Sequence, residues 1–142
     1  MENEFRGSLY QDESFIVTEL DGAKLERLII CEDLETKDVV MVFIKVENKE
    51  WHQFFLDAGF GFWQNYEDID PTDETNCDDE YNYIDKSIEF NILDKKVSKI
   101  WCEPHENNCQ ITLDFENNCR LILRTKESKI FDSDCELVVV NL

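Results

Sequence analysis

The sequence predicts a strand-dominated α+β fold: a largely antiparallel sheet or meander with one short aromatic-rich helix and a long acidic loop. Three observations predict it. Polar and apolar residues alternate through most of the C-terminal half, which is typical of strands with one face on a core. Residues 48–59 place apolar side chains at helical spacing. Residues 67–80 concentrate acidic side chains between two aromatic-rich segments.

The N-terminal third predicts three strands. Residues 14–20 and 25–31 are rich in β-forming residues and are separated by Asp21-Gly22, a two-residue signal that is typical of a hairpin turn. A polar turn from Asp33 to Lys37 leads into residues 38–46. Because β-branched and other apolar residues run almost unbroken through that last segment, we expect a central strand that is covered on both faces.

The predicted helix follows directly. Asn48 is placed to cap it, Glu50 falls in its first turn and Gly59 is placed to end it. The side chains that form its apolar stripe are Trp51, Phe54, Phe55 and Ala58. At about three turns, such a helix depends on packing more than on intrinsic propensity.

The C-terminal half predicts an antiparallel meander. Turns are expected at Asp94-Lys95-Lys96, at residues 104–108 and at Glu116-Asn117-Asn118. The strands that these turns separate are expected at residues 87–93, 97–102, 110–115, 120–125 and 137–140.

Length and composition predict one domain over residues 1–142, with an acidic and aromatic insert at residues 50–85. At 142 residues and 42% apolar composition, the chain can bury a sizeable core. The N-terminus is acidic and lacks an apolar signal region, and no apolar run is long enough to span a bilayer. We therefore expect a cytoplasmic protein whose six cysteines, which contain no C-x-x-C pair, are reduced thiols.

The charge balance predicts the class of partner. Thirty-three acidic residues against fourteen basic ones give a formal net charge of −19. Direct binding to nucleic acid or to an anionic membrane needs basic patches, so both are disfavoured. A basic protein is the expected partner, because opposite charge speeds encounter.

Residues 50–85 contain the predicted partner-binding site. This segment has eleven acidic residues, no Lys or Arg, and nine of the seventeen aromatic residues. Carboxylates there would steer a cationic partner, and aromatic side chains would supply short-range binding energy. The residues predicted to bind the partner are Glu67, Asp68, Asp70, Asp73, Glu74, Asp78, Asp79, Glu80, Trp63, Tyr66, Tyr81 and Tyr83.

Motifs for catalysis are sparse, and we expect no enzyme, no catalytic residues, no cofactor and no metal. Neither a phosphate-binding Gly loop nor a G-x-S-x-G elbow occurs. Cys102 with His105 could form a nucleophile–base pair, and with Cys109 and Cys119 a zinc site. Residues 68–74 imitate the start of a calcium loop but lack its glycine and contain Pro71. These readings remain weaker alternatives, as does a carboxylate pair for glycoside hydrolysis.

Three features resemble the bacterial immunity proteins of polymorphic toxin systems, which include the contact-dependent growth inhibition systems. They are Trp51-His-Gln-Phe-Phe-Leu-Asp-Ala-Gly-Phe-Gly-Phe-Trp63, the acidic stretch after it, and the terminal meander with Ile-Thr-Leu-Asp-Phe-Glu-Asn-Asn118. The resemblance covers roughly residues 50–142. It implies a small cytosolic protein that binds and blocks a cognate toxin domain, often a basic nuclease, and it carries over no catalytic residues.

The leading hypothesis is therefore an immunity-type inhibitor of a basic toxin domain. One alternative is a DNA mimic that occupies nucleic-acid sites on several host proteins, which would need acids spaced along an extended face. A second alternative is a small metal-binding or enzymatic domain. The oligomeric state stays open, because the acidic face disfavours self-association whereas an exposed sheet edge could pair with another chain.

Overall fold

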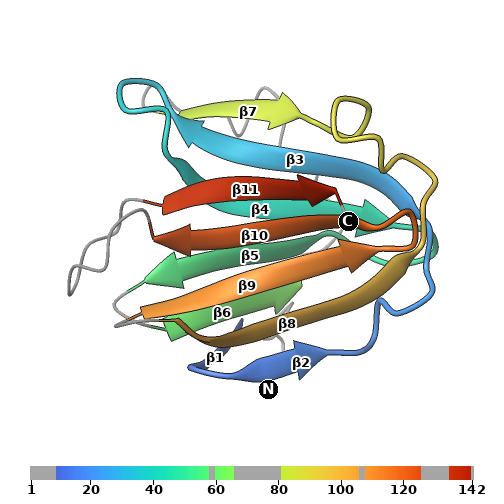
Figure 1. The fold of residues 1–142 in the computed structure, drawn as a ribbon, viewed down its shortest axis with the longest axis horizontal. Coiled ribbons are helices and arrows are strands. Elements are labelled where there is room, and N and C mark those ends of the chain that lie inside the picture. The colour runs from blue at the N-terminus through green and yellow to red at the C-terminus, as the bar shows by residue number, and fades with distance from the viewer. Residues whose placement is uncertain (1–8, 58–59, 66–80, 106–107, 126–134, 142) are drawn as a thin grey trace, which may run out of the picture.

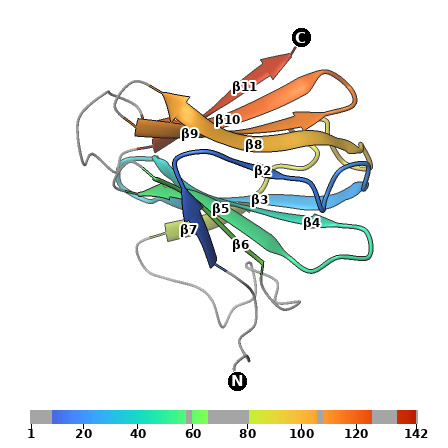
Figure 2. The ribbon, with the colours of Figure 1, turned by 90° about the horizontal axis from the view of Figure 1, so that it is seen from below.

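The computed structural model describes residues 9–57, 60–65, 81–105, 108–125 and 135–141, which form two antiparallel sheets packed face to face (Figures 1 and 2). In spatial order, sheet A consists of β1 (Leu9–Asp12), β6 (Phe60–Asn65), β5 (His52–Asp57), β4 (Val39–Val46), β3 (Leu25–Asp33) and β7 (Tyr81–Asp85). Sheet B consists of β11 (Cys135–Asn141), β10 (Cys119–Thr125), β9 (Asn108–Phe115), β8 (Val97–His105) and β2 (Phe15–Val17).

The strand-dominated, antiparallel character predicted from the sequence is confirmed. The predicted C-terminal meander corresponds to β8, β9, β10 and β11, which pair in chain order. Asn118, in the turn between β9 and β10, adopts a φ of 63°, a left-handed conformation that Asn tolerates better than most residues. The predicted central strand is also confirmed, because β4 lies between β3 and β5.

The main core lies between the two sheets and follows from period-2 alternation. In β3, Leu28 and Ile30 point into this core, and in β9 Ile111 and Leu113 do so from the opposite sheet. All four are buried, and each such side chain contributes roughly 1.5–3 kcal/mol relative to an exposed one.

The outer face of sheet A, directed away from sheet B, is also apolar. Ile29, Cys31, Phe43 and Trp51 are buried there and form a second cluster, which we call the outer cluster. Val40, Met41, Tyr81 and Tyr83 pack against it. A register shift in the β3–β4 pair leaves Val40 as an extra residue, because Met41 pairs with Cys31 while Val39 pairs with Glu32. Sheet A is therefore apolar on both faces along β3 and β4.

The first two strands join the two layers. Only Glu13 and Ser14 separate β1 from β2, yet β1 pairs with β6 in sheet A and β2 pairs with β8 in sheet B. Their pairing places the N-terminal segment along one side of the sandwich (Figure 2).

The helix predicted at residues 48–59 is not seen, and the prediction is wrong for residues 52–57, which form β5. Asn48, expected as a helix cap, has a φ of 61° and lies in the turn between β4 and β5. Within β5, Phe54 faces the inner core, whereas Phe55 lies on the outer face, where it stacks on Phe62. Because both faces of this strand carry aromatic side chains, polar alternation is lost, and the remaining spacing imitates a helix.

The strand predicted at residues 87–93 is also wrong. The backbone there turns, with Phe90 N–H donating to the Lys86 carbonyl at 3.0 Å and Ile92 N–H donating to the Ser87 carbonyl at 3.1 Å. A strand would place Ile88 and Ile92 on the same face, but Ile88 is 80% exposed whereas Ile92 is buried. Local side-chain hydrogen bonds favour this turn, because the Asp85 carboxylate accepts from both the N–H and the hydroxyl of Ser87.

The hairpin predicted at Asp21-Gly22 is wrong as well, because the strands on either side of it belong to different sheets. Gly22 has a φ of 79°, as the two-residue turn signal requires. Its N–H, however, donates to the Val97 carbonyl at the start of β8, at 2.8 Å. The turn therefore carries the chain from sheet B to sheet A.

Candidate functional site

Three of the twelve predicted site residues are described. Tyr66 and the eight acidic residues Glu67, Asp68, Asp70, Asp73, Glu74, Asp78, Asp79 and Glu80 lie outside the described residues. Tyr81 and Tyr83 lie together on β7, at one edge of sheet A. Trp63 lies on β6, which β5, β4 and β3 separate from β7. The two tyrosines and Trp63 therefore do not form one surface.

Trp63 lies on the inner face of sheet A, half-buried against the main core. It pairs with Phe54 across the β5–β6 hairpin and stacks on Phe15, with ring centroids 6.5 Å apart. Its ring also stacks on the buried His52, and its indole N–H donates to His52 Nδ1 at 2.8 Å. Within the described residues, Trp63 therefore holds a buried histidine in place and does not stand outward beside the two tyrosines.

Tyr81 and Tyr83 line a hollow of about 500 Å³ on the outer face of sheet A, which we call the tyrosine hollow. Its remaining lining residues are Cys31, Val40, Met41, Phe55, Leu56 and Asp57. The bulge in β4 brings Val40 beside Met41 at this point. The Tyr83 ring packs against Phe43 of the outer cluster, with centroids 6.1 Å apart, which orients the phenol.

One acidic side chain lines the tyrosine hollow, and an acidic stretch precedes β7 in the sequence. Asp57 lines it and is exposed, and residues 66–80, which immediately precede Tyr81, contain eight acidic residues and no basic one. Arg27 lies on the same sheet face, but its guanidinium is paired with Asp85 at 2.9 Å and lies over the Trp51 ring. This cation is therefore already neutralised by a neighbouring carboxylate.

Asp85 remains ionised for a local reason. Burial raises the pKa of its carboxyl, but hydrogen bonds from Ser87 and from Arg27 stabilise the carboxylate more strongly, so the net pKa is lowered. The carboxylate thus joins β7 to β3 while keeping its negative charge at the edge of the sheet.

Sequence reasoning missed most of the lining of the tyrosine hollow. It identifies Tyr81 and Tyr83, but it places Val40 and Met41 in a covered strand and Phe55 in a helix. Phe55 and Phe62 stack with centroids 4.6 Å apart and rings nearly parallel, because they are register partners on the outer face. The six consecutive apolar residues at 39–44 predict a strand that is covered on both faces, but they carry no signal for a hollow beside β7.

The residues considered for zinc do not gather at one point. The thiols of Cys102 and Cys109 both approach the Glu13 carbonyl, at 3.7 and 3.4 Å, whereas the Cys119 thiol lies at the Phe90 carbonyl. Burial raises the pKa of each of these thiols, which makes them weak nucleophiles. Among the residues that the structure describes, no three His, Cys, Asp or Glu side chains form a group that could hold a metal ion.

Within the described part of the chain, no helix has the length and apolar character needed to cross a membrane. Comparison of the chain with protein-family models, with curated proteins and with solved structures finds no match.

Proposed function

We propose that this chain is an immunity-type inhibitor that acts in the cytoplasm by binding a basic toxin domain of the nuclease class, without catalysing a reaction. One observation carries the proposal: an aromatic-lined hollow lies on β7, and β7 directly follows a fifteen-residue stretch with eight acidic residues and no basic one. The docking face would combine that stretch with the tyrosine hollow.

The proposed division of labour follows from the ranges of the two forces. Charge attraction acts over about 8–10 Å at physiological salt, so clustered carboxylates raise the association rate and orient the partner. Aromatic side chains act only at contact distance, and they slow dissociation. Truncation of one hot-spot residue often costs about 2 kcal/mol or more of binding free energy. Tyr81 and Tyr83 supply such rings on the described surface, whereas Trp63 is engaged with His52.

The tyrosine hollow also fits the side chains that a basic surface presents. A lysine or arginine inserted there would meet the faces of Tyr81 and Tyr83 and the carboxylate of Asp57. Cation–π contacts and ion pairing act together on such a side chain, and both are stronger where water is excluded.

The test uses the domain encoded by the reading frame beside this gene. We expect that domain to be toxic when it is expressed alone, and co-expression of this chain to restore growth. Binding of the purified pair is then measured by stopped-flow at several salt concentrations, with lysozyme as an unrelated basic protein. Lack of protection, or equal binding to lysozyme, would contradict the proposal.

Matched variants separate specific steering from net charge. Converting Asp73, Glu74, Asp78, Asp79 and Glu80 to amides should slow association by about ten-fold and flatten its salt dependence. The control converts five exposed acids elsewhere, Glu13, Asp21, Glu89, Asp94 and Glu116, and changes net charge equally. If both variants slow association to the same extent, the acidic stretch is not the docking face.

A DNA mimic predicts a different outcome of the same experiment. It would compete with duplex DNA for several unrelated DNA-binding proteins, whereas an immunity protein protects against one toxin domain. If this chain displaces duplex DNA from several proteins of such a panel, it is a DNA mimic and the immunity proposal is wrong.

A further inference from the structure

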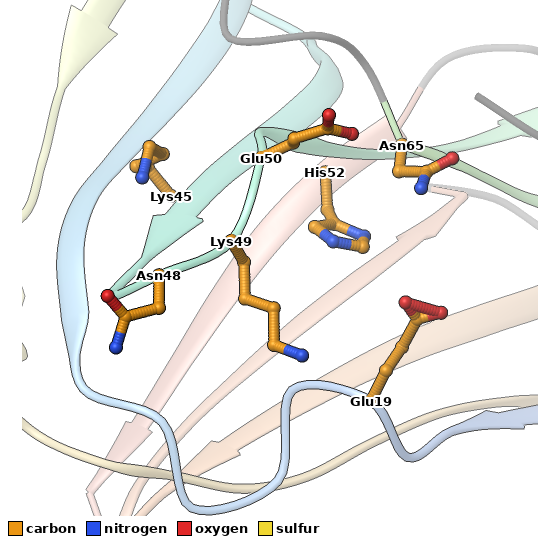
Figure 3. A pocket seen from close by; sticks show the side chains of 7 residues that line it. All are labelled: Glu19, Lys45, Asn48, Lys49, Glu50, His52 and Asn65. Carbon is orange, nitrogen blue, oxygen red and sulfur yellow. The ribbon is translucent and has the colours of Figure 1, made fainter. Parts of the chain in front are cut away.

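A second pocket, of about 420 Å³, opens at the end of sheet A where β4 turns into β5, whereas the tyrosine hollow includes the first residues of β4. It lies between the turn that joins β4 to β5 and the loop that follows β2 (Figure 3). Its lining residues are Glu19, Lys45, Asn48, Lys49, Glu50, His52 and Asn65. The volume falls within the range of about 300–1,000 Å³ that is typical of small-molecule sites.

His52 gives this pocket a fixed polar group. Its side chain is only 2% exposed, and its ring is held by stacking on Trp63 with centroids 5.9 Å apart. Because Nδ1 accepts the indole N–H of Trp63 at 2.8 Å, the proton of the neutral imidazole resides on Nε2. Within the described residues the His52 side chain makes no other hydrogen bond, so Nε2–H is a donor that a pocket ligand can satisfy.

The imidazole stays neutral at physiological pH. Burial lowers its pKa, and the positive charge of Lys49 lowers it further, to about 4. Nε2 is therefore a neutral donor beside a cation, a combination that favours a negatively charged or carbonyl oxygen.

One basic and one acidic side chain reach the part of the pocket in front of the His52 ring. The side chains of Lys49 and Glu19 both extend toward the space in front of the His52 ring, whereas the Glu50 carboxylate points away from it (Figure 3). Lys45 is already engaged, because its ammonium group bonds the Glu26 carboxylate at 3.4 Å and the Val46 carbonyl at 3.2 Å. Around the space in front of the His52 ring, a ligand therefore meets the ammonium group of Lys49, the neutral donor of His52 and the carboxylate of Glu19.

We propose that this pocket binds a small zwitterion of the α-amino acid type, with its carboxylate on His52 Nε2–H and Lys49 and its ammonium group on Glu19. A simple anion would leave the Glu19 carboxylate without a cation and would be repelled by the net charge of −19. A simple cation would be repelled by Lys49 and would leave the His52 donor unsatisfied. This inference does not depend on the proposed toxin binding.

The test follows the imidazole of His52 by NMR while each of the twenty free L-amino acids is added to the full chain. The chain has two histidines, so a His105→Gln variant assigns the signals. We expect at least one amino acid to shift the His52 signals saturably. The decarboxylated and the deaminated forms of that amino acid should each bind about ten-fold more weakly or worse, because each lacks one of the two charges.

Variants test the assigned contacts. Glu19→Gln and Lys49→Gln, both at exposed positions, should each weaken binding by about ten-fold or more. Glu35→Gln and Lys37→Gln, in the turn at the other end of β4, are matched controls that should bind as the parent chain does. For these variants, affinity is measured by calorimetry as well, because that readout does not depend on His52.

Three results would overturn the inference. The first is that no amino acid shifts the His52 signals saturably. The second is that the deaminated acid binds as tightly as the amino acid, which would make the pocket a plain anion site. The third is that Glu19→Gln and Lys49→Gln bind no differently from their controls.

Discussion

Replacement of His52 by Asn should remove a pH-dependent loss of stability from the folded chain. In the fold the pKa of His52 is lowered from its ordinary 6.5 to about 4, by burial and by the charge of Lys49. The unfolded chain therefore binds a proton between these two pH values, while the folded chain does not. Stability is fully present above pH 6.5, is lost as pH falls towards 4, and is constant for this group below that.

The size of the effect follows from the two pKa values. One pKa unit corresponds to about 1.4 kcal/mol, so the full shift is about 3 kcal/mol, of which about 2 kcal/mol is already lost at about pH 5. Asn places its side-chain oxygen where Nδ1 accepts from Trp63, but it does not titrate in this range. The parent chain should therefore lose about 2 kcal/mol more than His52→Asn between neutral pH and about pH 5.

Urea unfolding at neutral pH and at about pH 5 measures this difference directly. The comparison within each protein cancels the constant cost of the substitution, and the carboxylates and His105 are common to both chains. If the parent chain and His52→Asn lose equal free energy of unfolding over this range, His52 is not held neutral by burial, and the argument about its tautomer fails with it.

Three further outcomes can be checked with the same purified protein. Gly61→Ala should destabilise the fold by about 1–3 kcal/mol in urea unfolding, because a Cβ atom there would collide with Cys102 Sγ; Cys102→Ala should recover part of the loss, and no recovery would contradict the cause. Ser87→Ala should cost about 1–3 kcal/mol in thermal unfolding, since it removes the hydroxyl that accepts the buried Leu28 N–H at 2.8 Å; a neutral result would mean that another acceptor replaces it. In a Cys77→Ser variant, all five remaining thiols are buried, so they should react slowly with a chromogenic thiol reagent until urea is added. A rapid phase before urea is added would show that one of them is accessible.

The sequence predicted sheet B better than sheet A, for a physical reason. In β9, Ile111 and Leu113 face the core, while Gln110 and Asp114 face outward, so the period of two is visible. In β5, aromatic side chains occupy both faces, so the pattern of polar and apolar residues predicts a helix there. Alternation reports a strand only where one face meets water.

The candidate sites were less predictable than the strands, because they depend on register between segments. Tyr81 and Tyr83 reach Met41 only through the pairing of β7 with β3 and of β3 with β4. His52 meets Trp63 because of the register of the β5–β6 hairpin, and a shift of one residue would turn the indole to the other face of the sheet. Composition identified the acidic and aromatic window, but it carried no information about these pairings.

The step from β1 to β2 has a consequence for assembly of the chain. These two short strands cover β6 in one sheet and β8 in the other. If the segment that contains β1 and β2 were displaced, the edges of both β6 and β8 would be exposed at once. Uncovered edges bind other strands, including the equivalent segment of a second copy. Loss of the first seventeen residues should therefore leave a chain that is prone to exchange strands with its neighbours.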